Sequence, residues 1–263
     1  MSAPRETTAR APAQRVLPPG QAVLVTGASR GIGRAIAERL ASSSRGVVVN
    51  YRSGRDNGRA VAEGIKKRGG QALECQADVG DPEAVERMAT QIRESWGRLD
   101  AIIHNASAPM RRVRFEETDW NEFERHWATQ VRGAFNLVRA FLPELRAASG
   151  HVIFILSSSV LQQPPAQVSA YVTGKYALLG FARSVGVELA KSGIRVNMVS
   201  PYVTPTDMQA ELPPRMLQVM AETHPLRRLA TVQDTAAVVE FLLAPEAGYL
   251  HLANIPVTGG MVA

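Results

Sequence analysis

The sequence predicts an α/β protein built on one doubly wound parallel sheet with helices on both faces. Short apolar runs rich in β-branched residues alternate with longer segments of helical periodicity along the chain. Strands separated by helices pair in parallel, because a parallel neighbour is reached only through a long crossover connection. The sequence contains no internal repeat and no linker, so we expect residues 21–263 to form a single domain.

Seven apolar runs are predicted to be strands. Each is short and apolar throughout or nearly so, which is typical of parallel strands that are buried on both faces. The predicted strands are residues 22–25, 47–49, 72–75, 99–103, 152–156, 194–199 and 254–257.

Six helices are predicted between these strands. Their apolar side chains recur every three to four residues, which places them on one face of a helix. The third helix has a clear start signal, because Asp81 can cap its first turn and Pro82 fits the first helical position. The predicted helices are residues 32–40, 56–68, 81–96, 118–141, 168–190 and 232–243.

Two segments fall outside this alternation. Residues 1–20 contain four prolines and no apolar stretch, so we expect a disordered tail. Residues 202–225 contain several prolines together with Met208, Met216 and Met220. A segment of this length in a compact domain usually covers a binding site, so we expect a lid; a helical excursion with a methionine-filled core is compatible with the same pattern.

The composition limits the class of protein. The 263 residues are 45% hydrophobic and 21% charged, and the longest apolar run, 152–156, is far shorter than the ~18 residues that cross a bilayer. The net charge of +6 comes without a nucleic-acid-binding motif, so we expect neither nucleic acid nor membrane as a partner. Cys75 is the single cysteine, which favours a reducing compartment and a cytoplasmic location. The histidines show no ligand spacing, and no metal site is expected.

A glycine-rich segment follows the first predicted strand and opens the first predicted helix. Glycines let the backbone approach a pyrophosphate, and the free N–H groups at a helix start bind its negative charge. This arrangement predicts a dinucleotide site. The predicted contacts in this segment are Gly27, Ser29, Arg30, Gly31, Ile32 and Gly33.

The second predicted strand ends in Asn50, Tyr51, Arg52 and Ser53, which are expected beside the adenosine ribose. An NAD-selective site usually places an acid here to bind the ribose 2′-hydroxyl, and this sequence has none. Arg30 and Arg52 can instead flank a 2′-phosphate, with Ser53 donating a hydrogen bond. We therefore predict NADPH/NADP+ as the cofactor.

Tyr171 and Lys175 stand four residues apart on a predicted helix and therefore share one face. An ammonium beside a phenol stabilises the phenolate and lowers a pKa that starts near ~10. The pair predicts a proton donor that works near neutral pH.

Together these motifs resemble the short-chain dehydrogenase/reductase family, in particular its 3-oxoacyl-[acyl-carrier-protein] reductase-like members. The resemblance covers residues 21–262. It rests on residues 26–33, 78–79, 105–106, 157–159, Tyr171 with Lys175, 195–197, Pro201 with Thr206, 224–229 and 259–260.

The resemblance implies a Rossmann-type fold, often in a homotetramer, and hydride transfer between a nicotinamide and a carbonyl or alcohol. In the implied mechanism Tyr171 protonates the carbonyl oxygen, and Lys175 lowers the pKa of Tyr171 and holds the nicotinamide ribose. A serine orients the carbonyl: counting back thirteen residues from Tyr171 gives Ser158, counting along the strand gives Ser157, and we expect Ser158. The implied cofactor contacts are Asp78 and Val79 at the adenine, Asn105 and Ala106 at the ribose, Thr206 at the carboxamide, and Pro201, Val203, Tyr171 and Lys175.

Four residues depart from the family pattern. His104 stands in place of an Asn and is expected to pack at a strand end, and Ser107 stands in place of a Gly and is expected to shift the backbone beside the cofactor. Gln130 aligns with the Asn that is thought to hold a water in the proton relay to lysine; it keeps the amide, one methylene further out, and we count it among the catalytic residues. Tyr202 stands in place of a Gly and is expected to narrow the nicotinamide pocket or stack on substrate.

We therefore expect an NADPH-dependent carbonyl reductase acting on a β-ketoacyl thioester or a related ketone. An acyl carrier protein is a further expected partner, with Arg146 and Lys191 as docking candidates. One alternative is a secondary-alcohol dehydrogenase for a polyol, steroid or specialised metabolite, and another is a non-catalytic or regulatory NADP(H)-binding protein. An enoyl reductase fits less well because its Tyr-to-Lys spacing is wider, and a halohydrin dehalogenase because it lacks the glycine-rich loop and the lysine.

Overall fold

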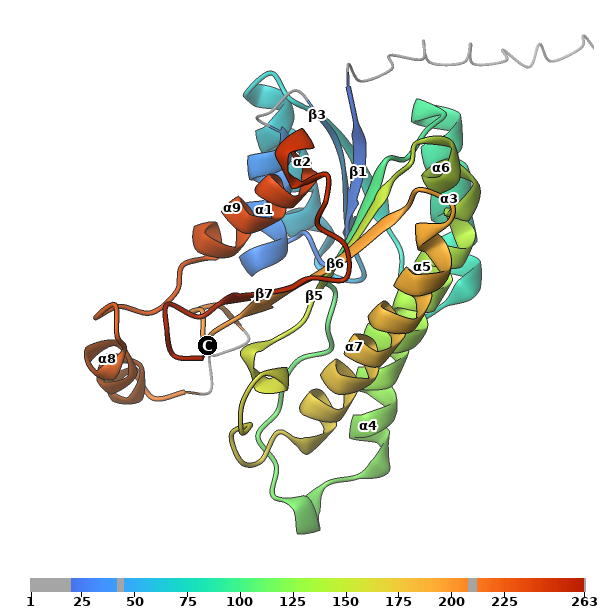
Figure 1. Cartoon of the computed structure of the whole chain (residues 1–263). Helices are drawn as coiled ribbons and strands as arrows, with labels where there is room; N and C mark the ends of the chain where they lie inside the picture. The colour runs from blue at the N-terminus through green and yellow to red at the C-terminus, as the bar shows by residue number, and fades with distance from the viewer. Residues whose placement is uncertain (1–19, 42–44, 208–211, 263) are drawn as a thin grey trace, which may run out of the picture.

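The computed structural model describes residues 20–41, 45–207 and 212–262. All but the last residue of the predicted tail, and residues 208–211 of the predicted lid, including Met208, lie outside the described residues. The described part of the chain forms one seven-stranded sheet in the order β3-β2-β1-β4-β5-β6-β7, with every neighbouring pair parallel (Figure 1). The strands are β1 (Ala22–Val25), β2 (Gly46–Tyr51), β3 (Gln71–Gln76), β4 (Ala101–His104), β5 (His151–Ile155), β6 (Arg195–Pro201) and β7 (Asn254–Val257).

Helices cover both faces of this sheet, and each face has its own apolar core (Figure 1). Successive side chains of a strand point to opposite faces, so Val23 and Val25 enter one core while Leu24 enters the other. The first core is completed by α1 (Gly31–Ala41), α2 (Arg55–Lys67) and α9 (Val232–Leu243), and the second by α3 (Pro82–Trp96), α5 (Gly133–Ala140), α6 (Leu142–Ala147) and α7 (Ser169–Ala190). The predicted doubly wound α/β fold is confirmed.

The long helix predicted over residues 118–141 is present over residues 120–140, but it is not a regular α-helix. The structure has α4 (Trp120–Trp127), a π-helical segment over Ala128–Arg132 and then α5. A π-helical turn adds a residue to the turn and frees main-chain groups, and such turns are frequent at functional sites. Here it contains Gln130.

The segment predicted to be a lid contains α8 (Pro214–Thr223), which projects from the rest of the fold (Figure 1). No residue of α8 is buried. The helical alternative for part of this segment is therefore correct, although the methionines of α8 fill no core. In the part of the chain that the structure describes, no helix is both long and apolar enough to cross a membrane.

We predict that Gly58→Ala destabilises the fold. A Cβ at Gly58 would lie 2.2 Å from the ring of Tyr51, which is 2% exposed and bonded through its hydroxyl to Glu74. The ring cannot move aside without breaking that bond, and overpacking of this kind costs ~1–3 kcal/mol. Gly64→Ala is the matched control in the same helix, because its Cβ would meet only the Arg68 side chain at 3.6 Å. Urea unfolding of both variants checks this; equal stabilities would contradict it.

Candidate active site

The loop after β1 forms a cradle that depends on glycine. A Cβ at Gly33 would lie 2.2 Å from the Gly27 carbonyl oxygen, so only glycine permits the loop to fold back on the start of α1. Gly27 itself has a φ of +62°, in the left-handed region. Gly31 also has a positive φ, +55°, and lies beside the Thr206 side chain. The cradle therefore fits a pyrophosphate at the start of a helix.

The loop after β4 is tied to this cradle. The Thr26 hydroxyl oxygen accepts hydrogen bonds from the main-chain N–H groups of Asn105 and Ala106, both at 3.0 Å. The Asn105 side-chain amide donates back to the carbonyl oxygens of Thr26 and Gly27. β1 and β4 are neighbours whose connections run to opposite sides of the sheet, which is where doubly wound sheets bind ligands.

The residues predicted to bind the adenosine part of the cofactor fall into an exposed group and a buried group. Arg52 lies 3.8 Å from Asp78 and Arg30 lies 3.1 Å from Asp207, with all four side chains largely exposed at the edge where the strands end. They are free to reorient toward a bound phosphate. Ser53 is also exposed, next to Arg52.

The side chains of Asn50 and Tyr51, two of the residues predicted to bind the cofactor, point into the fold, so a contact with the cofactor would have to come from their main chain. The Asn50 amide donates to the carbonyl oxygens of Cys75 and Ala77, and the Tyr51 hydroxyl bonds Glu74. Both side chains are buried and hold β2 to β3. The polar residue types suggested a surface role, but a buried strand must also satisfy its polar groups internally.

Tyr171 and Lys175, the predicted catalytic pair, lie on the buried face of α7. Tyr171 is 8% exposed and Lys175 is 3% exposed. The Lys175 ammonium donates to the Ile155 carbonyl oxygen at 2.7 Å, and its Nζ lies 5.7 Å from the centre of the Tyr171 ring. Burial lowers the pKa of Lys175 to about 7, because the charged form loses its solvation.

Burial raises the pKa of Tyr171, and a hydrogen bond with the Ser157 hydroxyl lowers it by less. These two causes account for the shift of the Tyr171 pKa, and the expected lowering by Lys175 is not found. Tyr171 is therefore a neutral phenol at neutral pH, which is the protonated form that a reduction needs in its general acid.

The serine beside Tyr171 is Ser157, which corrects the expectation of Ser158. Ser157 directly precedes a short 3-10 turn, Ser158–Val160, and its hydroxyl contacts both Tyr171 and Ser159. Ser158 lies inside the turn, where its carbonyl oxygen accepts from Leu161. Counting along the chain could not locate this turn, whose start decides which hydroxyl faces Tyr171.

His104 packs at the end of β4, as expected. Its Nε2 donates to the Gln130 carbonyl oxygen at 3.0 Å, so its Nδ1 is the acceptor for the Thr26 hydroxyl at 3.3 Å. Burial lowers the pKa of His104 to about 4, so the ring is neutral at working pH. The ring also packs edge-on against Phe154.

Gln130 is buried in the π-helical segment, and it contacts a residue that the sequence reasoning missed. Its amide lies 3.1 Å from both Ser107 Oγ and His126 Nδ1. The His126 ring packs edge-on against the Tyr171 ring, with 5.7 Å between ring centres. A lone histidine on a helix carries no sequence signal for such a contact.

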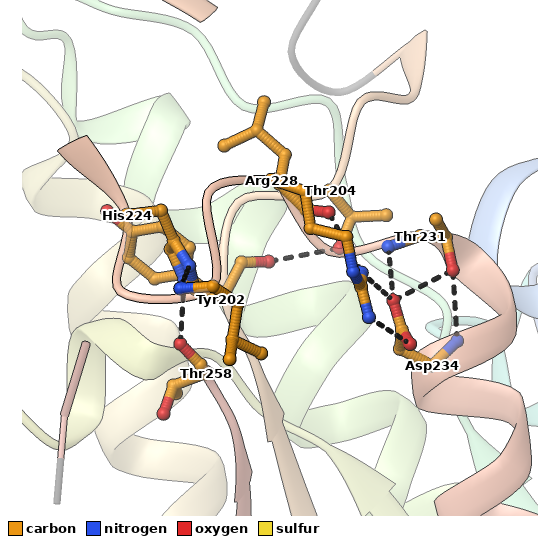
Figure 2. Close-up of polar contacts among 9 residues, drawn as sticks. Tyr202, Thr204, His224, Arg228, Thr231, Asp234 and Thr258 are labelled. Atoms are coloured by element: carbon orange, nitrogen blue, oxygen red, sulfur yellow. Dashed lines mark hydrogen bonds and ion pairs between the residues drawn. The ribbon is translucent and has the colours of Figure 1, made fainter. Parts of the chain in front are cut away.

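Tyr202 packs against the end of the predicted lid segment (Figure 2). Its ring centre lies 5.5 Å from that of His224, whose Nε2 donates to the Thr258 carbonyl oxygen at 2.9 Å. Beyond His224, Arg228 pairs with Asp234 at the start of α9 (Figure 2). Tyr202 thus packs where the end of the predicted lid segment meets the residues that follow β7.

Arg146 and Lys191 lie at the edge of the sheet opposite to Tyr171. They precede the first residues of β5 and β6, whereas Tyr171 lies beyond the ends of the strands. Along α7, the twenty residues from Tyr171 to Lys191 span about 30 Å at a rise of ~1.5 Å per residue. The structure therefore contradicts their assignment as docking residues for a carrier that must reach Tyr171.

Known proteins with similar sequences identify the family of this chain. A model of the family described as enoyl-(acyl carrier protein) reductase covers residues 27–262. The chain belongs to the short-chain dehydrogenase/reductase family. It is 34% identical over 244 residues to 3-oxoacyl-[acyl-carrier-protein] reductase FabG of Staphylococcus epidermidis, which covers 92% of this chain and 98% of that protein. It is 35% identical over 242 residues to the reductase MabA of Mycobacterium tuberculosis, with 92% of each chain covered.

Solved structures of this short-chain dehydrogenase/reductase family show the same fold. A dehydrogenase/reductase from Sinorhizobium meliloti superposes with a TM-score of 0.85 at 31% identity, covering 92% of this chain and 94% of the other. A short-chain dehydrogenase from Burkholderia cenocepacia, solved in complex with NADP, has a TM-score of 0.85 at 29% identity and covers 94% and 99% of the two chains. Family membership confirms the prediction of an oxidoreductase.

We predict that Ser157→Ala lowers kcat by about 10²–10³-fold, the usual cost of removing a donor to a developing oxyanion. Ser158→Ala, the matched control in the adjacent position, should stay within a few-fold of the unchanged protein. Steady-state reduction of a ketone substrate measures both. A large loss in Ser158→Ala with none in Ser157→Ala would restore the sequence-based choice.

Proposed function

We propose that this protein is an NADPH-dependent ketoreductase acting on a β-ketoacyl thioester. The observation that carries the proposal is Tyr171, a buried phenol that remains protonated and is hydrogen-bonded to Ser157 at the edge of the sheet that bears the glycine-rich cradle. The two curated relatives above are named for the reduction of 3-oxoacyl groups on acyl carrier protein.

The residues of the chain have different roles in the proposed reaction. The Gly27–Gly33 loop would hold the pyrophosphate of the dinucleotide, Thr206 its carboxamide and Lys175 its nicotinamide ribose. NADPH, when bound, supplies the hydride. Tyr171 donates its phenolic proton to the substrate oxygen as negative charge develops there, and the Ser157 hydroxyl donates a hydrogen bond to the same oxygen.

The preference for NADPH over NADH rests on charge. Arg52 and Ser53 follow β2 directly, at the place where an NAD-selective site usually has an acid. Arg30 extends from the glycine-rich loop. A 2′-phosphate would be attracted to both guanidinium groups, whereas a bare ribose would gain nothing from them.

The carrier protein would dock on the segment that follows β4 rather than at Arg146 and Lys191. Arg111 and Arg114 are exposed there, and between them the Val113 N–H donates to the Gln167 carbonyl oxygen just before α7. Met110 packs against the cluster that contains Tyr171. Acidic carrier surfaces would meet these arginines within reach of the active site.

The proposal also includes a lid over residues 202–225 and a homotetramer. The exposed apolar surface of the protein supports the homotetramer. Large apolar side chains stand exposed on α4, α5 and α7, which is unusual for a surface that stays in water. They are Trp120, Trp127, Phe135, Tyr176 and Val187. The tail, the single catalytic domain and the cytoplasmic location remain predictions from the sequence.

A ketone that is not a thioester is the second candidate substrate. One structural relative, with a TM-score of 0.84 at 27% identity, is a levodione reductase. A non-catalytic role is disfavoured because Ser157, Tyr171 and Lys175 are assembled. The enoyl reductase named by the family model is disfavoured by the four-residue spacing of Tyr171 and Lys175.

The test is oxidation of NADPH with a panel of β-ketoacyl thioesters, simple ketones and enoyl thioesters. We expect turnover of the β-ketoacyl thioesters and a loss of at least ~10²-fold in Tyr171→Phe, which removes the proton donor. Tyr176→Phe is the control, because Tyr176 lies on the same helix but is 47% exposed. Binding of NADPH without turnover of any substrate would refute the reductase, and turnover of enoyl thioesters alone would reassign it.

A second prediction concerns cofactor choice. We expect Arg52→Ala to raise the KM for NADPH about tenfold or more, the usual scale for losing a charge-assisted hydrogen bond, and to leave the KM for NADH unchanged. Arg59→Ala serves as the control, since Arg59 is equally exposed but lies on α2 and pairs with Glu63. A protein that prefers NADH before any substitution would exclude the proposed NADPH preference.

A further inference from the structure

His126 is a buried polar side chain beside Tyr171 that the proposed reaction does not use. It lies on α4, is 2% exposed, and packs its ring edge-on against the Tyr171 ring. Burial lowers the pKa of His126 to about 4, so the imidazole is neutral at neutral pH. A neutral imidazole has one N–H donor and one acceptor nitrogen, so its chemical role depends on which nitrogen carries the hydrogen.

The hydrogen bonds of Gln130 show which nitrogen this is. The Ser107 hydroxyl donates its one hydrogen to the Ala108 carbonyl oxygen at 3.2 Å, so it can only accept from the Gln130 amide nitrogen, 3.1 Å away. The same amide nitrogen lies 3.1 Å from His126 Nδ1. Because Nδ1 faces an N–H donor, it is the acceptor, and the ring hydrogen of His126 is on Nε2.

The Nε2–H group of His126 has no acceptor within residues 20–41, 45–207 and 212–262. It also differs from Gln130 Oε1, which is sealed in the interior without a partner, because His126 Nε2 retains some accessible surface. The group is therefore a hydrogen-bond donor that no described residue uses and that a ligand can reach.

The direction of the His126 side chain places this donor toward the start of α7. Its Cβ lies beside Gly174, where an added Cβ would approach it to 3.4 Å, and its ring centre lies 5.7 Å from that of Tyr171. Tyr171 precedes Gly174 by three residues, so the imidazole extends along α7 toward the first turn of the helix. There Val168 and Met110 pack in the same apolar cluster as Tyr171. The open donor thus faces the side of Tyr171 on which an acyl substrate would lie.

The proposed substrate has a second oxygen that the proposed reaction leaves without a donor. A β-ketoacyl thioester carries a ketone oxygen and a thioester carbonyl oxygen on two carbons that are separated by one methylene group. Tyr171 and Ser157 bind the ketone oxygen in the proposed reaction. A neutral N–H group beside Tyr171 suits the thioester oxygen, because it donates a hydrogen bond without giving up its proton. A simple ketone offers no such acceptor.

We propose that His126 is a specificity-determining residue, whose Nε2–H donates to the thioester carbonyl oxygen while Tyr171 and Ser157 bind the ketone oxygen. The inference rests on the proposed function and leaves its chemistry unchanged, since Tyr171 still protonates the ketone oxygen and the thioester stays intact. The thioester carbonyl is the same before and during hydride transfer, so this hydrogen bond strengthens binding more than it speeds the chemical step. Substrates with a second carbonyl at this spacing are therefore preferred over simple ketones.

Two substitutions separate the roles of the two ring nitrogens. His126→Asn places an amide oxygen near the position of Nδ1, so it keeps the acceptor for Gln130 and removes the donor at Nε2. His126→Gln places an amide N–H group near the position of Nε2, so it keeps the donor and removes the acceptor for Gln130. A role in substrate recognition and a role in packing therefore respond differently to the two variants.

The first measurement is the ratio of kcat/KM for S-acetoacetyl-N-acetylcysteamine to kcat/KM for 2-hexanone. We expect this ratio to fall about tenfold in His126→Asn, mainly through a higher KM for the thioester, which is the scale of one lost hydrogen bond. In His126→Gln the ratio should stay within about threefold of the unchanged protein. Equal losses with both substrates in His126→Asn would overturn the inference, because they would show a structural role.

A binding measurement separates this inference from the proposed function. Tyr171→Phe removes the proton donor and keeps the ring that contacts His126, so the Kd of S-acetoacetyl-N-acetylcysteamine can be measured with NADPH bound. We expect adding His126→Asn to raise this Kd about tenfold. An unchanged Kd would overturn the inference even if the protein is an active reductase. A raised Kd, in a protein that reduces no substrate with Tyr171 present, would uphold the recognition by His126 and refute the reductase.

Discussion

The active site depends on the hydrogen bonds of Thr26, because they join two loops that the topology sends in opposite directions. The chain leaves β1 toward one face of the sheet and leaves β4 toward the other. Between them a crevice opens that is unavoidable in a doubly wound sheet. The Thr26 hydroxyl oxygen takes the N–H groups of both Asn105 and Ala106 and so sets the width of this crevice. Its own proton is donated toward His104, which extends the same network to Gln130 and the catalytic helix.

The hydrogen-bond network leads to α7, where the burial of the Lys175 ammonium determines the chemistry of the site. Lys175 is almost fully buried, and the groups around it carry no negative charge at neutral pH. The ammonium is therefore stabilised by an uncharged acceptor, the Ile155 carbonyl oxygen. The same burial keeps Tyr171 protonated. The site is thus prepared to give up a proton rather than to accept one, which suits reduction more than oxidation.

The fold and the placement of Tyr171 and Lys175 on one buried helix face could be predicted from the sequence because both depend on local periodicity. The strands at 22–25 and 254–257 were placed to the residue, since apolar runs bounded by polar residues have few other solutions. Tyr171 and Lys175 followed from helical spacing alone. The sequence left a choice between Ser157 and Ser158 because the choice depends on where a 3-10 turn begins. It did not show that the Tyr51 ring is buried, because the packing of that ring against Gly58 is a tertiary contact. His126 was missed because nothing in its neighbourhood along the chain reports the amide that it binds.

The residues that break the family pattern contact one another, and this explains how the site tolerates them. A glutamine in place of an asparagine carries an amide one methylene further out, where it needs new acceptors; Ser107, itself a departure, supplies one of them. Tyr202 is likewise matched, because its added ring packs on His224, and His224 in turn requires a glycine at position 259, where a Cβ would approach its ring to 2.4 Å. Coupled residues of this kind are not additive. Restoring glycine at position 107 would therefore remove an acceptor from the Gln130 amide, and restoring glycine at position 202 would remove the ring that packs on His224.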